Sequence, residues 1–115
     1  LKLPNVEQVY VPPEKIIDYL LDVEHESGRG KALFFIHFGF SVAKWEVLAQ
    51  ALVSHANQND VVKQEMTRFG TRYVIEGVLE TPSQRKPQVR VVWFIPKDAR
   101  IPRLATAYPL EESDD

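Results

Sequence analysis

The apolar residues of this chain change their spacing near residue 60, and that change limits the folds open to it. Before residue 60, apolar side chains recur every three to four positions, which is typical of helices with one buried face. After it, they alternate with polar residues, which is typical of strands. The pattern predicts an α+β fold with three N-terminal helices packed on one face of a four-stranded antiparallel β-meander.

The helical half predicts three segments. The first begins at Pro12-Pro13, because proline is tolerated in the first turn of a helix, and it ends near Asp22. The second covers residues 31–38 and is apolar nearly all round, which predicts a short buried helix. The third follows Ser41, a residue suited to the N-cap. Its expected buried stripe consists of Trp45, Leu48, Ala49, Leu52, Val53 and Ala56.

The alternating half predicts strands at residues 61–67, 71–79, 88–95 and 104–108. The short connections between them favour antiparallel neighbours. Strict alternation places one set of side chains on a common buried face: Tyr73, Ile75, Leu79, Val89, Val91, Trp93 and Ile95. In the last strand it predicts Leu104, Thr106 and Tyr108 on one face, with Ala105 and Ala107 on the other.

The length of 115 residues suits one domain, expected over residues 1–110, followed by an acidic tail at 111–115 that we predict to be disordered. The chain has no cysteine, which excludes a disulfide framework, a thiolate zinc site and a cysteine nucleophile. We find neither a signal-peptide pattern nor an apolar run of about 20 residues. The sequence therefore predicts a cytoplasmic protein without a membrane segment.

The net charge of −2 conceals an uneven distribution. Residues 63–103 carry nine Lys and Arg against four Asp and Glu, a balance of +5. A basic region of this kind is typical of proteins that bind an anionic ligand. Solvated strand edges also favour Lys and Arg, and the charge alone favours this second interpretation.

A candidate site lies before the second helix, in residues 25–31. Gly28, Arg29 and Gly30 can form a tight turn that presents N–H groups to an anion, and Lys31 adds a full positive charge. His25 can exchange a proton near neutral pH. The alternative is an ordinary glycine-containing loop with a surface histidine.

Further candidates lie in the strands. Arg72, Thr106 and Tyr108 can project from the open face of the sheet, where an arginine fork would hold a phosphate. Alternatively Arg72 pairs with a glutamate, Glu76 or Glu80, and Tyr108 is packed. The histidines share no metal-ligand spacing, so the sequence predicts neither a metal site nor a cofactor.

The chain resembles a family of small bacterial proteins described only as a domain of unknown function. The matching residues are Lys15-Ile16-Ile17-Asp18-Tyr19-Leu20-Leu21, His25, Gly28-Arg29, Lys31-Ala32, Phe69-Gly70-Thr71-Arg72-Tyr73, Val92-Trp93 and Pro102-Arg103-Leu104 with Thr106-Ala107-Tyr108. The chain departs from the family pattern at Asp22, Glu26 and Gly30, where Asn, Pro and His are usual. The loss of histidine at position 30 weakens a mechanism that needs two histidines.

The layout is also similar to that of the barnase, colicin and RelE group of metal-independent ribonucleases, many of which are toxins. This fold-level analogy implies an RNA endonuclease that works by attack of the 2′-hydroxyl. In that role His25 would be the acid or base, Lys31 and Arg72 would hold the phosphate, and Thr106 with Tyr108 would orient it. The expected partners are RNA and a cognate antitoxin or immunity protein. The alternative is a non-enzymatic immunity or adaptor protein that binds its partner through the sheet.

Overall fold

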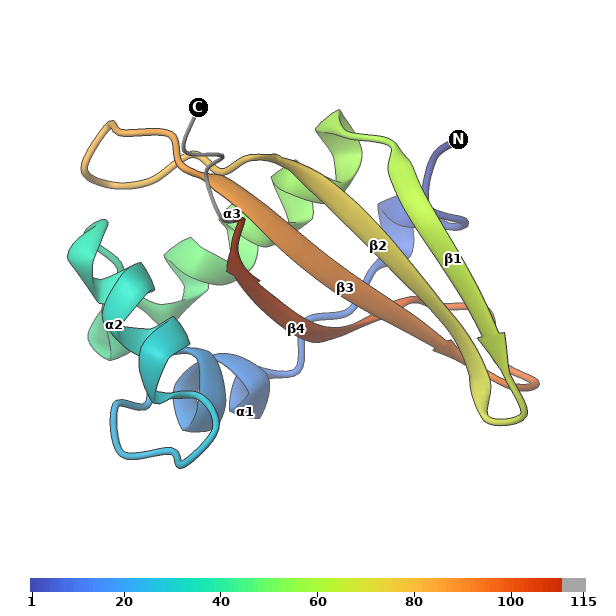
Figure 1. Ribbon diagram of the computed structural model, residues 1–115, viewed down its shortest axis with the longest axis horizontal. Coiled ribbons are helices and arrows are strands. Elements are labelled where there is room, and N and C mark those ends of the chain that lie inside the picture. Colours follow the sequence, from blue (N-terminus) through green and yellow to red (C-terminus); the bar gives the residue numbers. More distant parts are fainter. Residues whose placement is uncertain (111–115) are drawn as a thin grey trace.

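The computed structural model describes residues 1–110, which form three α-helices and a four-stranded antiparallel sheet (Figure 1). The α+β class is confirmed, and the tail at 111–115 lies outside the described residues. The helices are α1 (Pro13–Lys15), α2 (Arg29–His37) and α3 (Trp45–Gln58), accompanied by short turns η1 (Val6–Gln8), η2 (Ile16–Leu20) and η3 (Val42–Lys44). The strands are β1 (Val61–Thr67), β2 (Gly70–Val78), β3 (Gln88–Pro96) and β4 (Arg103–Pro109).

The first predicted helix is a composite. Only three residues are α-helical, and η2 continues as a π-helical turn in which the N–H of Leu21 donates to the carbonyl of Ile16 at 2.8 Å. Such turns recur at functional positions in other proteins. Here Lys15 and Tyr19 lie on one side of the turn, with the Lys15 Nζ 5.4 Å from the centre of the Tyr19 ring.

The sheet has the order β1-β2-β3-β4, as expected of a meander. One face is apolar and buried, and its residues belong to one cluster with the apolar side of α3. Trp93 is fully buried, as predicted, whereas Trp45 is only half-buried at the start of α3. Ser41 accepts a hydrogen bond from the N–H of Lys44, so the expected N-cap is confirmed.

The predicted faces of the last strand are wrong in part. The pairing register shifts between Val92, which lies opposite Thr106, and Trp93, which lies opposite Leu104. An extra residue in one strand turns the following side chains over. Leu104 and Ala107 therefore both point into the core.

The helices meet the sheet in two ways. The α3 helix packs beside β2, where the Nε2 of buried His55 lies 3.2 Å from the carbonyl of Gly77. The η2 turn and α2 instead contact the edge of the sheet at β4 (Figure 1). The prediction that all three helices pack on one face is therefore not confirmed.

The second helix is less buried than its composition predicts. Ala32 and Phe35 are fully buried, but Leu33 and Ile36 are 51% and 42% exposed. Within residues 1–110, no single helix is long and apolar enough to cross a membrane; α2 and the following helix reach that length only as a pair bent by 75°.

Candidate functional site

The hydroxyl of Tyr19 joins side chains from three parts of the chain. It lies 2.9 Å from the Oγ1 of Thr106 in β4, 87 residues away in sequence. The ammonium of Lys31, in the first turn of α2, donates a hydrogen bond to it. The Nζ of Lys31 also lies 5.8 Å from the centre of the Tyr108 ring. We call Tyr19, Lys31, Thr106 and Tyr108 the tyrosine cluster.

The surroundings of Tyr19 shift its proton equilibrium. Partial burial raises the pKa of Tyr19, but the hydrogen bonds with Lys31 and Thr106 and the charges of Lys31 and Lys15 act in the opposite direction and outweigh it. The pKa of Tyr19 is therefore below its ordinary value. A phenolate at this position would accept hydrogen bonds from both Lys31 and Thr106.

His25 borders the tyrosine cluster, with its ring edge-on to Tyr19 and the centroids 5.0 Å apart. Its Nδ1 accepts the N–H groups of Ser27 at 3.1 Å and Gly28 at 3.0 Å. The proton of the neutral ring is consequently on Nε2. His25 can donate a hydrogen bond from Nε2, but in this arrangement it has no free lone pair with which to accept a proton.

The amides of the glycine loop form hydrogen bonds within the loop itself. The amides of Ser27 and Gly28 donate to His25 Nδ1, and the Arg29 amide donates to the His25 carbonyl, so these three amides already have partners within the loop. A Cβ at Gly28 would lie 2.7 Å from the carbonyl oxygen of Tyr19, so glycine is required there for close approach. Gly30 lies in the first turn of α2 with open space around it.

The polar face of the sheet extends the cluster away from the helices. Arg90 in β3 forms an ion pair with Glu76 at 2.6 Å and a hydrogen bond to the Tyr108 hydroxyl at 3.5 Å. These two contacts raise the pKa of Arg90, so it stays charged. Arg72 is paired with Glu65 at 2.8 Å, and neither Glu76 nor Glu80 is its partner.

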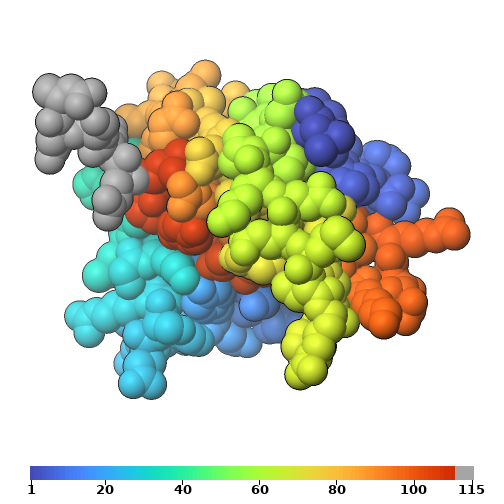
Figure 2. All heavy atoms as spheres, turned by 45° about the vertical axis from the view of Figure 1, so that its right-hand side comes forward, coloured from blue at the N-terminus to red at the C-terminus, as the bar shows by residue number. Residues whose placement is uncertain are grey.

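A shallow hollow of about 410 Å³ lies on this face. Its lining residues come from all four strands: Val62, Lys63, Glu65, Arg72, Val74, Glu76, Arg90 and Tyr108. Figure 2 shows the region from one side, with β1 (yellow-green) in front, α2 (cyan) beside it and β4 (red) between them. The hollow and the tyrosine cluster share Tyr108 and thus form one continuous polar region.

The structure brings most of the predicted site residues together. His25, Lys31, Thr106 and Tyr108 surround Tyr19, while Arg72 reaches only the neighbouring hollow. Sequence reasoning missed Tyr19 as the central group and Arg90 as a member of the site. Alternation in β3 already placed Arg90 opposite the apolar face, so that signal was available; the position of Tyr19 depends on contacts across the fold.

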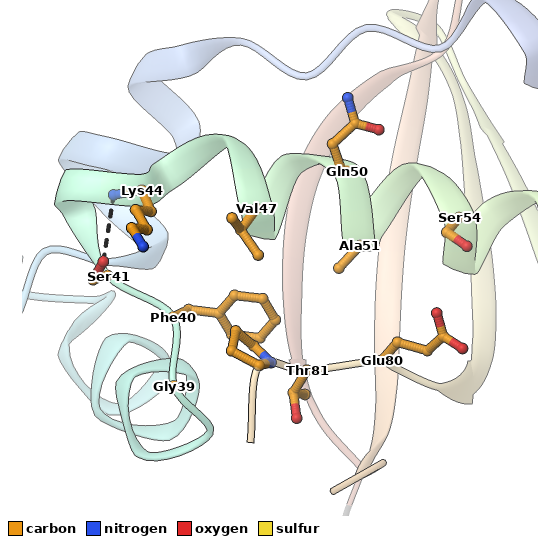
Figure 3. A pocket seen from close by; sticks show the side chains of 11 residues that line it. Gly39, Phe40, Ser41, Lys44, Val47, Gln50, Ala51, Ser54, Glu80 and Thr81 are labelled. Carbon is orange, nitrogen blue, oxygen red and sulfur yellow. Dashed lines mark hydrogen bonds between the residues drawn. The ribbon is translucent and has the colours of Figure 1, made fainter. Parts of the chain in front are cut away.

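A larger hollow of about 610 Å³ lies elsewhere, between α3 and the segment after β2. Phe40, Val47 and Ala51 line its middle, with Ser41 and Lys44 at one end and Glu80 and Ser54 at the other (Figure 3). It contains none of the predicted site residues. Among the residues that the structure describes, its charged side chains are Lys44 and Glu80, so we place the chemistry in the tyrosine cluster despite the difference in volume.

The part of the chain that the structure describes contains no group of side chains suited to hold a metal ion. Among residues 1–110, no three His, Asp or Glu side chains lie close enough together to hold an ion. The residues with shifted proton equilibria in the site are a tyrosine and an arginine. The site is therefore a cluster of hydrogen-bond donors and cations around a phenol.

Comparison with solved structures identifies the same arrangement of elements in another protein. A chain in the contact-dependent growth inhibition toxin–immunity protein complex from Klebsiella pneumoniae 342 superposes with a TM-score of 0.70. The match covers 93% of this chain and 97% of that one, at 21% sequence identity. At this identity the likeness concerns the fold. A search of curated proteins found no match.

The family comparison confirms the resemblance found in the sequence. A family model described as a domain of unknown function, DUF6883, matches residues 2–111, which is nearly the whole chain. The matched stretch includes the tyrosine cluster and His25. This chain therefore belongs to the DUF6883 family of domains of unknown function.

Proposed function

We propose that this protein is a toxin-like, metal-independent RNA endonuclease whose site is the tyrosine cluster with His25. The observation that carries the proposal is the Tyr19 hydroxyl, which is bound by Lys31 and Thr106 and has a lowered pKa. A perturbed titratable group beside a cation is a good candidate for proton transfer, and the cluster borders the polar hollow at Tyr108. The fold shared with a chain of a toxin–immunity complex supports the toxin-like assignment.

The reaction requires one proton acceptor and one proton donor. In the proposed mechanism, the Tyr19 phenolate takes the proton of the ribose 2′-hydroxyl, and the 2′-oxygen attacks the adjacent phosphorus. As the bond from phosphorus to O5′ breaks, the Lys31 ammonium gives a proton to O5′. The products are a 2′,3′-cyclic phosphate and a 5′-hydroxyl. Proton transfer from Tyr19 back to Lys31, along their hydrogen bond, restores the starting state.

The remaining residues would bind the phosphate. Within residues 1–110 the Nε2–H of His25 has no hydrogen-bond partner, so we assign it to a phosphate oxygen and not to proton abstraction. Arg90 and Arg72 would add positive charge on the sheet side, although each is partly neutralised by its glutamate. Thr106 would hold the Tyr19 oxygen in place.

The direct test is cleavage of total RNA by the purified protein in the presence of EDTA. We expect fragments that end in 2′,3′-cyclic phosphate, while DNA of the same length survives because it lacks the 2′-hydroxyl. Lys31→Met should slow cleavage about 10²-fold or more, the usual contribution of a positioned acid or base. Lys44→Met, which removes an exposed lysine outside the site, is the matched control and should cleave normally. Intact RNA after incubation with folded wild type would contradict the proposal.

The pH dependence offers a second test. If Tyr19 is the base and Lys31 the acid, the rate should rise with pH as Tyr19 loses its proton, and it should fall again at a pH where the acid is no longer protonated. Lys31 lowers the pKa of Tyr19 by a hydrogen bond and by its charge, so Lys31→Met should move the rise to higher pH. Ultraviolet titration of tyrosinate should show the same displacement for one tyrosine. If the rate rises at the same pH in wild type and in Lys31→Met, Tyr19 is not the base.

A second candidate is an immunity or adaptor protein, since the similar fold occurs in a complex that contains an immunity protein. The exposed Leu33 and Ile36 on α2 offer an apolar contact area to a partner. The candidates differ in their effect on cells. Expression of a ribonuclease toxin should arrest bacterial growth, and Tyr19→Phe should relieve the arrest. An immunity protein would leave growth unchanged.

A further inference from the structure

We infer that three joined hollows lead from the tyrosine cluster to the far end of the sheet and form a track for single-stranded RNA. The inference rests on the proposed function, because it names the surface that would hold the substrate beyond the cleaved phosphate. The track is defined by five cations, Lys15, Arg103, Arg100, Lys97 and Arg68, together with the aromatic residues Phe94, Tyr10 and Phe69.

The hollows are continuous in their lining. Lys15, whose Nζ is 5.4 Å from the Tyr19 ring, lines the first hollow of about 320 Å³ together with Phe94 and Arg103. Arg103 also lines the second, of about 420 Å³. The second and third share Pro96 and Ala99, and the third, of about 390 Å³, extends to Arg68.

Backbone contacts fix the segments that line the second and third hollows. The amide of Lys97 donates to the carbonyl of Phe69 at 2.9 Å, which ties the β3–β4 connection to the β1–β2 turn. Figure 1 shows these two turns next to each other at one end of the sheet. The amide of Tyr10 donates to Pro102, which places the N-terminal segment beside β4. The track therefore runs over fixed backbone.

The charge of the track is strongly positive. Among residues 1–110, its five cations share their hollows with two acids, Glu14 and Asp98. In the described part of the chain, none of the five takes part in an ion pair. Arg72 and Arg90, by contrast, are both paired with glutamates. Unpaired cations are those that a phosphate backbone can bind without first breaking a contact.

Exposed aromatic rings lie between the cations. Phe69 is 68% exposed, with the guanidinium of Arg68 4.9 Å from its centre, and Tyr10 is 52% exposed beside Arg103. Exposed rings between cations suit unpaired bases, because every base can stack on an aromatic face while its phosphate meets a cation. An acidic protein would need the cations but not the rings, so the arrangement favours a single nucleic acid strand.

The test measures binding separately from cleavage. The probe is a fluorescein-labelled 2′-O-methyl oligouridylate of twelve nucleotides. It lacks the attacking hydroxyl and therefore cannot be cleaved. Its binding to the full chain is measured by fluorescence anisotropy. The double variant Arg68→Gln/Arg100→Gln should weaken binding at least tenfold and reduce the slope of log affinity against log salt by about 1.4, or about 0.7 for each lost phosphate contact. Phe69→Ala should weaken binding about tenfold through lost stacking. The control Lys44→Gln/Lys86→Gln removes the same charge at exposed positions outside the track and should bind normally.

Each result has a defined consequence. Wild-type affinity in the double variant, or no binding of the probe by wild type, would overturn the track. If polyglutamate competes for the surface and Phe69→Ala has no effect, the surface binds an acidic protein and the RNA track is wrong. If wild type cleaves RNA while the track variants bind and cleave normally, the track fails and the proposed function stands. If RNA stays intact but the track variants lose the probe, the ribonuclease fails and the track stands.

Discussion

The two faces of the sheet are built from alternate residues of the same strands, but they differ in composition and in role. On one face Ile75, Val91 and Trp93 are fully buried with the apolar side of α3. On the other, glutamate–arginine pairs surround a shallow hollow that continues into the tyrosine cluster. The apolar face supplies the burial that stabilises the fold, and the polar face gathers titratable and charged groups on that rigid support.

This difference explains why charged residues in the strands need not destabilise the fold. Arg72 and Arg90 are about one-third to two-fifths exposed and already have carboxylate partners, so folding leaves them partly solvated. Surface pairs of this kind contribute little to stability. Changes on the polar face should therefore alter binding or reaction rate, whereas changes on the apolar face should alter the free energy of unfolding.

The largest expected effect comes from Trp93→Ala. Truncation of this fully buried ring should lower the free energy of unfolding by about 3–5 kcal/mol, measured by urea denaturation. Phe94→Ala, its half-buried neighbour on the opposite face, is the matched comparison and should cost clearly less. Equal losses at the two positions would break the distinction between the faces.

Tyr19→Phe is the corresponding test of the polar face, where we expect an effect on activity and not on stability. Removal of the hydroxyl takes away the group bound by Lys31 and Thr106 but keeps the ring. RNA cleavage should fall about 10²–10⁴-fold, as for loss of a positioned base. The urea midpoint should change little. Lys44→Met, at an exposed position outside both the cluster and the track, should retain the wild-type rate.

A smaller effect concerns His55, which reaches the apolar side of the molecule from α3. Burial lowers the pKa of His55, and the backbone of Gly77 and of Val89 offsets only part of that effect. A histidine whose pKa is lower in the folded state binds a proton more readily when unfolded. Stability should thus be fully present above the unfolded pKa of about 6.5 and fall below it, by at most about 1.4 kcal/mol per pH unit.

Urea midpoints of wild type at acidic and neutral pH measure this dependence. His55→Gln should remove it, while His37→Gln, at an exposed position, should keep it. An unchanged pH dependence in His55→Gln would assign the effect to another group.

The smallest effect is expected at the Glu65–Arg72 pair. Both side chains are about 40% exposed, so Glu65→Gln should change the free energy of unfolding by less than about 1 kcal/mol. Freed of its partner, Arg72 should make the polar face more attractive to anions, and the affinity for the oligouridylate probe should rise slightly. A loss of several kcal/mol would show that this pair also stabilises the fold.

Local patterns were sufficient for much of the fold. The strand at 61–67 was predicted with the observed ends, and the other three differ from prediction by one residue at one or both ends. Ser41 caps the third helix as expected, because its side chain acts on an amide three residues away. Period-two alternation also identified most of the core residues of β2 and β3, since it reports which face of a strand is apolar; it missed Val74 and Val92, which are buried on the other face.

The candidate site could be predicted as a set of residue types but not as a geometry. His25, Lys31, Thr106 and Tyr108 were chosen for their chemistry, and the fold brings them together. Their roles changed once the contacts were known. His25 uses its Nδ1 within its own loop, and Arg72 pairs with Glu65, which is 7 residues away in sequence but opposite it in the neighbouring strand.

The sequence alone determined the class of fold, the strands and the apolar face, because these depend on periodicity and capping over a few residues. Only the tertiary structure decided that Tyr19 meets Thr106 and that Thr106 and Leu104 point to opposite sides of the sheet. The first depends on a π-helical turn packed against the edge of the sheet, and the second on an extra residue in one strand. Both arise from the pairing of segments far apart in the chain, which no local pattern specifies.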